Sequence, residues 1–187
     1  MVCIMALVSD ELYFFRELVI VGQILTLPDM KMLSSGLWRN KYLQNLTLVN
    51  WDLYGDVKIV EELLSGISKN TSLETLNLSN NSLKDAHLPG LDTILELNVS
   101  LKNLFLDNNK LESCDFMAGL SRNETLEALS LSGNPINPEA TGDLLAIVNT
   151  CSSLVYLNLA GIMFEGLTTL ITAHLKTSKI QYLTAEI

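Results

Sequence analysis

Apolar residues recur along the chain in a pattern whose copies begin at 15, 43, 73, 101, 126, 154 and 180. Three copies place leucine or isoleucine around an asparagine in the same way: Leu73-x-x-Leu76-x-Leu78-x-x-Asn81-x-Leu83, Leu101-x-x-Leu104-x-Leu106-x-x-Asn109-x-Leu111 and Leu126-x-x-Leu129-x-Leu131-x-x-Asn134-x-Ile136. The copies at 15, 43 and 154 are looser and lack the asparagine, and the copy at 180 is partial. A nearly constant period of this kind is the sequence signature of a solenoid built from stacked units.

Each copy of the pattern predicts a short strand followed by a turn. In Leu76-x-Leu78 the period of two sends both leucines to the inner side of a strand. The asparagine follows where the chain turns, and its amide can pair with backbone groups that would otherwise be buried without partners. We therefore expect Asn81, Asn109 and Asn134 to form a ladder across neighbouring units, and Trp51, at the same position of an earlier unit, to be buried.

The sequence between the predicted strands has helical spacing. Its clearest example is the set Val57, Val60, Leu63, Leu64 and Ile67, which lies on one helix face. Asn137-Pro138 has the composition of a helix start and predicts a helix over about 138–149. Comparable helices are expected over about 29–39, 87–97, 114–122 and 165–176. Strand and helix alternate along the chain, which predicts an α/β solenoid in which each unit is stabilised by its neighbours.

This pattern resembles the leucine-rich repeat family over about 15–187. Units of this length leave room for a full helix and are similar to the ribonuclease-inhibitor-like subfamily, known mostly from intracellular proteins. The resemblance implies a curved right-handed β-α superhelix with a parallel sheet on the concave face and helices on the convex face. Residues 15–187 would form a leucine-rich repeat domain of six to seven units, and 1–14 an N-terminal cover or partial repeat.

The ends of the chain carry an expectation of their own. Terminal units of a solenoid need a polar outer face, whereas the repeat pattern here continues almost to Ile187. No C-terminal cap is recognisable in the sequence. We therefore expect either pairing through uncapped solenoid ends or a place for this chain within a longer solenoid.

Composition narrows the classes of partner. The 187 residues are 48% hydrophobic and 18% charged, with a net charge of -9. These values are typical of a soluble globular domain, and the acidic excess argues against nucleic acid or an anionic membrane as the partner. Cys3, Cys114 and Cys151 are far apart and odd in number, so they suggest neither a disulfide framework nor a zinc site. Because the N-terminus also lacks the features of a signal peptide, we expect a cytoplasmic location.

No residues are spaced as in a recognisable catalytic or metal site. The sequence contains no motif pairing a nucleophile with a base, no metal-ligand spacing and no phosphate-binding glycine loop, so we expect no enzymatic activity, metal or cofactor. His87 and His174 fall in helical segments of different units, where we expect ordinary surface or half-buried positions. Single glycines at 22, 133 and 161 match tight turns after strands.

Six Asn-x-Ser/Thr sequons occur, beginning at Asn45, Asn70, Asn77, Asn80, Asn98 and Asn123. On a secreted protein they would indicate glycosylation. We interpret them as a product of the repeat, because a phrase such as Asn70-Thr71-Ser72-Leu73 reflects a polar helix exit before a strand.

The inner sheet surface is the strongest candidate for function. Its outward strand positions form a neutral, polar grid that becomes aromatic toward the C-terminal half, and aromatic side chains are frequent binding anchors. Alternatively, these aromatic residues only pack on each other or on a neighbouring segment. The residues that we expect to bind a partner are Thr75, Asn77, Asn103, Phe105, Asp107, Tyr156, Asn158 and Tyr182.

These observations favour a non-catalytic protein-protein interaction module or scaffold that binds a protein partner on its concave sheet face. Two alternatives stay open. One is a regulator of a small GTPase or other signalling enzyme, although the three arginines, Arg16, Arg39 and Arg122, offer no recognisable arginine finger. The other is a fragment of a secreted recognition receptor.

Overall fold

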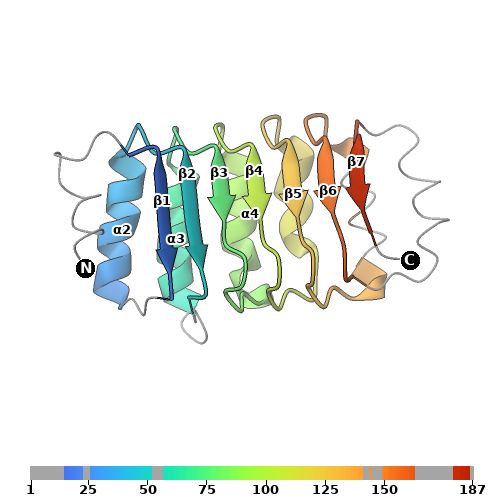
Figure 1. The fold of residues 1–187 in the computed structure, drawn as a ribbon, viewed down its shortest axis with the longest axis horizontal. Helices are drawn as coiled ribbons and strands as arrows, with labels where there is room; N and C mark the ends of the chain where they lie inside the picture. Colours follow the sequence, from blue (N-terminus) through green and yellow to red (C-terminus); the bar gives the residue numbers. More distant parts are fainter. Residues whose placement is uncertain are drawn as a thin grey trace.

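A computed structural model of the chain shows a seven-stranded parallel sheet beside a layer of helices (Figure 1). The structure describes residues 15–22, 26–51, 57–140, 144, 149–162 and 179–185. The strand order in the sheet follows the chain order, so each unit adds its strand beside the previous one. The strands are β1 (Glu17–Val21), β2 (Asn45–Val49), β3 (Thr75–Asn77), β4 (Asn103–Phe105), β5 (Ala128–Ser130), β6 (Tyr156–Asn158) and β7 (Tyr182–Thr184).

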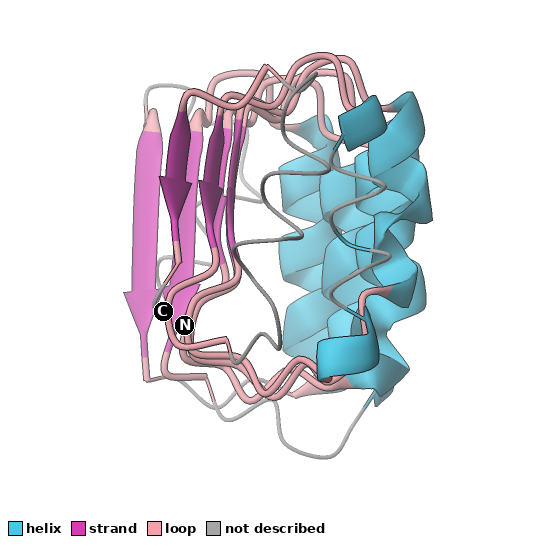
Figure 2. Ribbon diagram, turned by 90° about the vertical axis from the view of Figure 1, so that its right-hand side faces the viewer, coloured by secondary structure: helices cyan, strands magenta, loops and turns pink. Residues whose placement is uncertain are grey.

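The helices cover one face of the sheet, and the opposite face carries no described helix (Figure 2). They are α2 (Leu27–Arg39), α3 (Val57–Ser68) and α4 (Leu88–Leu97), with 3-10 helices η1 (Asp85–His87) and η2 (Asp115–Arg122). Residues 138–140, 144 and 149–150 are also helical, in agreement with the helix predicted over 138–149. The helix predicted over 165–176 lies outside the described residues. The predicted α/β solenoid architecture is confirmed.

The unit that contains η2 differs from the α-helix expected over 114–122. Its motif begins at 101 and the next one at 126, the shortest interval between motifs, so a shorter stretch of chain must cross the same width of the layer. A 3-10 helix rises about 2.0 Å per residue against about 1.5 Å for an α-helix, so the eight residues of η2 span about 16 Å. The ten residues of α4 span about 15 Å. Because the 3-10 helix rises more per residue, it covers about the same length with fewer residues.

The start of α2 is fixed by a capping box. Thr26 caps the helix through its hydroxyl oxygen, which accepts from the Asp29 backbone N–H, and the Asp29 carboxylate in turn accepts from the Thr26 N–H at 3.0 Å. Hydrogen bonds from the side chain and then the backbone of Thr26 lower the pKa of the Asp29 carboxyl. The helix consequently begins at Leu27, two residues before the start predicted from apolar spacing.

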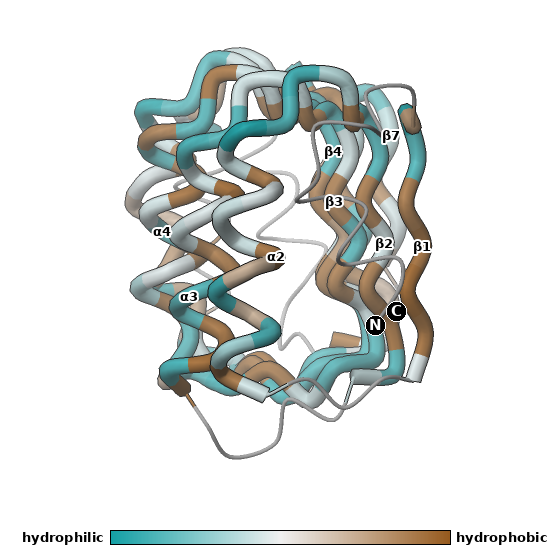
Figure 3. The backbone as a smooth tube through the Cα atoms, turned by 90° about the vertical axis from the view of Figure 1, so that its left-hand side faces the viewer, coloured by the Kyte–Doolittle hydropathy of each residue, from teal (hydrophilic) through white to brown (hydrophobic). Residues whose placement is uncertain are grey.

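The core lies between the sheet and the helices. Leu76 and Leu78 are buried on the helix side of the sheet, and Leu63, Leu64 and Ile67 face them from α3. Figure 3 shows apolar segments along the strands, most continuously along β1. No helix among the described residues is long and apolar enough to cross a membrane.

A column of left-handed residues marks the turn after successive strands. Their positive φ angles run from 51 to 74° and fall one residue before the asparagine-ladder position of each unit. The members of the column are Gly22, Asn50, Asn80, Asn108, Gly133 and Gly161. Glycine and asparagine are the residues that tolerate this conformation best, so the expectation for the three glycines is confirmed and asparagine takes the same place in the middle units.

Candidate functional site

The strand-exit asparagines form the predicted ladder. Asn109 Oδ1 accepts the N–H groups of Asn81 and Leu83, both at 3.0 Å, while its Nδ2 donates to the Leu78 and Leu106 carbonyls. Asn81 Oδ1 accepts the backbone N–H of Trp51 at 2.8 Å, and the Trp51 side chain is buried, as expected. The ladder holds neighbouring strands in register and thereby fixes the opposite, concave face of the sheet.

A second asparagine ladder, absent from our sequence predictions, runs along the helix exits. Asn98 Oδ1 accepts the N–H groups of Ser100 and Leu101, and its Nδ2 donates to the carbonyls of Ile67 and Asn70 in the preceding unit, each at 3.0 Å. Asn70 and Asn123 make equivalent bonds. The signal that could have found it is the recurring phrase Asn-x-Ser/Thr-Leu. The sequons at Asn70, Asn98 and Asn123 are therefore built into the fold, with buried amides.

Strand pairing gathers the eight predicted binding residues on the concave face. One row of the register contains Glu17, Asn45, Thr75, Asn103, Ala128, Tyr156 and Tyr182. The next row contains Val19, Thr47, Asn77, Phe105, Ser130, Asn158 and Thr184. Asp107 follows β4 and lies further along the same side.

The polar members of the predicted set bond to one another or to the local backbone. Asn77 and Asn158, at equivalent positions of their units, accept the N–H two residues ahead. Asn103 Nδ2 donates to the hydroxyl of Thr75 at 3.1 Å. The Asp107 carboxylate accepts from the Ser130 hydroxyl and from the Ser132 N–H. These side chains therefore stabilise the face as well as lining it.

Two outward positions of the predicted grid are not open. Ser79 and Ser130 are buried, the latter with only 1% of its surface exposed. The Ser79 hydroxyl accepts the Asp107 N–H, and Ser130 lies under the Asp107 carboxylate. A period of two assigns these serines to the outer side of the strand. It carries no information on Asp107, which bonds to both serines and covers Ser130 with its carboxylate.

Three aromatic side chains remain on this face. Tyr156 and Tyr182 are directly paired in adjacent strands. Phe105 lies two strands before Tyr156, about 10 Å across the sheet, and in the next row along the strands. Tyr182 is 62% exposed, while Phe105 and Tyr156 are half-buried. In the described part of the chain, neither tyrosine hydroxyl has a hydrogen-bond partner.

The N-terminal edge of the concave face carries an apolar feature that our sequence predictions omitted. Val19 and Val21 of β1 are more than half exposed on the same side as the grid. The loose motif of the first unit identifies Leu18 and Ile20 as core positions. The same period of two could therefore have placed Val19 and Val21 on the outward side of the strand. The concave face is thus aromatic toward one end and aliphatic at the other.

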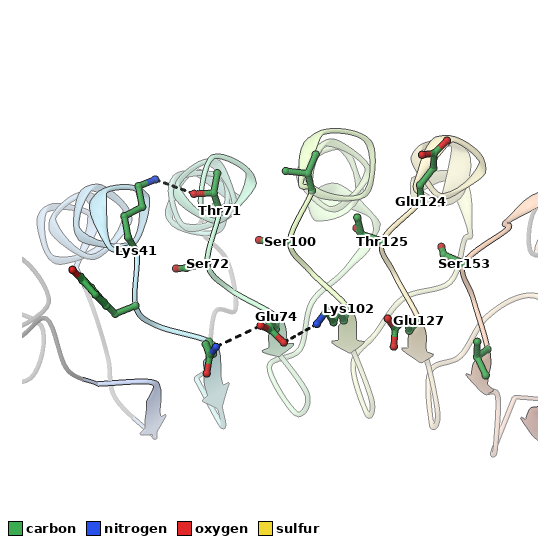
Figure 4. Close-up of a pocket in the computed structure, with 14 residues that line it drawn as sticks. Lys41, Thr71, Ser72, Glu74, Ser100, Lys102, Glu124, Thr125, Glu127 and Ser153 are labelled. Atoms are coloured by element: carbon green, nitrogen blue, oxygen red, sulfur yellow. Dashed lines mark hydrogen bonds and ion pairs between the residues drawn. The ribbon is translucent and has the colours of Figure 1, made fainter.

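An open groove of about 740 Å³ lies on a different surface, along the loops that lead from the helices into the strands (Figure 4). Lys102 pairs with Glu74 at 3.0 Å inside it, and this hydrogen bond raises the pKa of the Lys102 ammonium. Lys41 donates to the Thr71 hydroxyl near one end, and Glu127 lies toward the other. No pattern in the sequence predicts this groove, because its walls come from five successive units.

The histidine and cysteine residues of the described part of the chain do not come together as a metal site. No group of three or more His, Cys, Asp or Glu residues there could hold a metal ion. Cys114 and Cys151 are buried thiols, as expected for residues that fill small core gaps. His87 is buried, contrary to the surface or half-buried position expected for it, because η1 turns its ring toward the core. His174 lies outside the described residues.

Comparison with known sequences supports the repeat assignment. Residues 69–86 and 122–140 match the family described as "Leucine Rich repeat". Each segment contains one helix-exit and one strand-exit asparagine. The chain is also 32% identical over 90 residues to leucine-rich repeat-containing protein 45 of Gallus gallus. That alignment spans 46% of this chain and 13% of the relative's length.

Solved structures with a similar fold include two domains of other proteins. Actin-binding site 2 of leiomodin-1 is 16% identical with a TM-score of 0.51, and the match covers 92% of this chain and 83% of that one. The C-terminal domain of tropomodulin from Caenorhabditis elegans is 15% identical with a TM-score of 0.53, covering 94% and 90%. At these identities the likeness concerns the fold alone, an α/β solenoid.

Proposed function

We propose that the chain is a non-catalytic module or scaffold that binds a protein partner on its concave sheet face, anchored by Phe105, Tyr156 and Tyr182. One observation carries the proposal. On a face whose polar residues are largely bonded within the sheet, these aromatic side chains expose ring surface, and both tyrosine hydroxyls lack a partner among the described residues. Aromatic side chains with a free polar tip are enriched among the residues that dominate binding energy.

Preorganisation supports this assignment. The two asparagine ladders fix neighbouring units to one another, and the grid residues hold each other in place through bonds such as Asn103 to Thr75. A partner would therefore meet a surface that loses little conformational freedom on binding, which removes a large cost of association. Thr75, Asn77, Asn103, Asp107 and Asn158 would act as the polar surroundings of the aromatic anchors.

The proposal includes a cytoplasmic location and a repeat of the ribonuclease-inhibitor-like type. Two buried thiols, Cys114 and Cys151, support a reducing compartment. Full α-helices such as α2 and α3 behind the strands, with motifs spaced widely enough to contain them, support the repeat type.

Affinity capture from the native source under reducing conditions tests the proposal. The baits are the wild-type chain, a concave variant (Phe105→Ala/Tyr156→Ala/Tyr182→Ala) and a control variant with two exposed side chains removed from the helix layer (Lys31→Ala/Glu61→Ala). Each bait is first shown to be folded by circular dichroism. We expect a protein that wild type and control capture and the concave variant loses. Equal capture by all three baits would contradict binding on this face.

Purified actin serves as a defined bait in the same design, because one of the similar folds is an actin-binding site. Binding of actin by wild type and control but not by the concave variant would identify it as a partner of this face.

A further inference from the structure

Exposed apolar side chains gather at the helix exits as well as on the concave face. Of the large apolar residues that are more than half exposed in the described part, four lie at the ends of helices or in the loops that follow them: Trp38, Tyr42, Leu97 and Val99. Among the three concave aromatic residues, only Tyr182 is exposed to this extent. The helix exits are therefore a second candidate interaction surface.

Leu97 and Val99 stand out when equivalent positions of the units are compared. They flank the buried Asn98 and are 59% and 70% exposed. The residues that flank the corresponding asparagines in other units are polar or charged: Arg39 and Lys41, Lys69 and Thr71, and Arg122 and Glu124. The bonds to the preceding unit at this exit come from the Asn98 amide and the Ser100 hydroxyl, and neither the Leu97 nor the Val99 side chain can make one. Folding therefore does not require two apolar side chains here.

Val99 and Tyr42 also line the groove along the helix-exit loops. The groove extends from the loop before β2 to the loop before β6, which is four strand spacings or about 19 Å. An extended chain advances about 3.3 Å per residue, so about six residues would fill this length. Because the groove is long and open, it suits an extended segment rather than a small molecule, which binds in an enclosing pocket.

The charges along the groove change sign from one end to the other. Lys41 lines one end of the groove, and Glu124 and Glu127 line the part beyond η2. Arg39 and Lys69 lie outside the lining, at the exits of α2 and α3. The salt bridges between described residues join Lys102 to Glu74 and Arg122 to Glu96, and involve none of these five. Lys102 and Glu74 therefore neutralise each other within the groove, while Lys41 at one end and Glu124 toward the other make no salt bridge between described residues.

We propose that this surface, the helix-exit edge formed by Arg39, Lys41, Lys69, Leu97, Val99 and Glu124, binds an extended segment of a partner protein. The segment places apolar side chains on Leu97 and Val99, acidic residues against the basic end and a basic residue against Glu124 and Glu127. Burial of the two apolar side chains supplies affinity, and the opposite charges at the ends set the direction of the segment.

Selection from a phage-displayed library of random ten-residue peptides on the immobilised full chain tests the proposal. We expect enriched peptides with an apolar centre, acidic residues on one side and a basic residue on the other. Their affinity should fall at least tenfold for Leu97→Ser/Val99→Ser and stay unchanged for Tyr182→Ala on the concave face. Both variants are first checked for folding by circular dichroism and thermal melting.

A charge reversal adds an independent readout. Selection on Glu124→Lys/Glu127→Lys should enrich peptides whose basic residue is replaced by an acidic one. The proposal would be overturned by a library that yields no enriched peptide, or by peptides that bind wild type and Leu97→Ser/Val99→Ser equally. It would also be overturned if Leu97→Ser/Val99→Ser abolished self-association in analytical ultracentrifugation, because the edge would then join copies of this chain.

Discussion

Asparagine has three different structural roles in this chain, and position alone decides among them. Asn70 lies at a helix exit, Asn80 adopts the left-handed turn conformation and Asn81 belongs to the strand-exit ladder. The strand-exit role was predictable because the motif places this asparagine where backbone groups need partners. The helix-exit role was missed because the same residues read as sequons, although a buried amide with a donor and an acceptor suits both places.

Replacement of Asn109 tests the ladder at the scale of one side chain. Asn109→Ala removes the acceptor for two buried N–H groups and the donor to two carbonyls, so we expect a loss of about 1 to 3 kcal/mol in the free energy of unfolding. Asn108→Gly is the matched control, since Asn108 is exposed with a positive φ that glycine also adopts. Urea denaturation that gives equal stabilities for the two variants would argue against the ladder.

His87 provides a test by pH. Burial lowers the pKa of its imidazole, while the Lys84 backbone and the charge of Glu61 oppose this in part and the charge of Lys84 adds to it. The ring stays neutral in the folded chain at a pH where the unfolded chain already binds the proton. Stability should therefore fall as the pH drops below about 6.5, the ordinary value for histidine.

The measurement is the free energy of unfolding of wild type and His87→Gln at pH 7.5 and pH 5.5. We expect the difference between the two proteins to shift in favour of the variant at the lower pH, because the variant has no imidazole to protonate when it unfolds. A difference that is the same at both values would show that His87 titrates alike in the folded and unfolded chain.

Helices and strands differ in how well the sequence predicts them. The strands follow directly from the motif, because its leucines alternate with outward residues over each short segment. The type of helix does not follow, since the helical spacing over 114–122 fits either form and only the short unit length favours the 3-10 helix η2. Covered positions such as Ser130 depend on the side chain of a neighbouring unit, here Asp107, and were missed for that reason.

Gly66 tests how closely adjacent helices approach. A Cβ atom at this position of α3 would lie 2.5 Å from the backbone oxygen of Ser34 in α2. Helix propensity alone favours Gly66→Ala by about 1 kcal/mol, but overpacking in a close contact costs about 1 to 3 kcal/mol. We expect a lower melting temperature for Gly66→Ala and little change for Ser65→Ala, an exposed neighbour in the same helix. A stabilised Gly66→Ala would mean that α2 and α3 are farther apart.

For the whole molecule, the sequence predicts one interaction surface and misses the other. The concave grid is predictable because parallel pairing in register turns a period of two into rows of side chains. The helix-exit edge is not, because its exposure depends on how the loops of five units stand side by side. Leu97 and Val99 become conspicuous only when the units are compared with each other and their exposure is known.

Tyr156 links the stability of the molecule to its binding surface. If its ring belongs to the concave face, Tyr156→Ala should destabilise the chain less than Asn109→Ala, because the tyrosine forms no buried hydrogen bond within the described residues and its ring is half-buried. Thermal melts of the two variants provide the measurement. A larger loss for Tyr156→Ala would assign this residue to the core.

Site-specific photo-crosslinking tests the central claim most directly. A photoreactive phenylalanine derivative is placed at position 182 on the concave face or, as a control, at position 31, an exposed site on α2. Each protein is irradiated in extract from the native source. Binding on the concave face predicts a discrete crosslinked protein from position 182 and none from position 31. The same protein crosslinked from position 31, with nothing from position 182, would contradict the account.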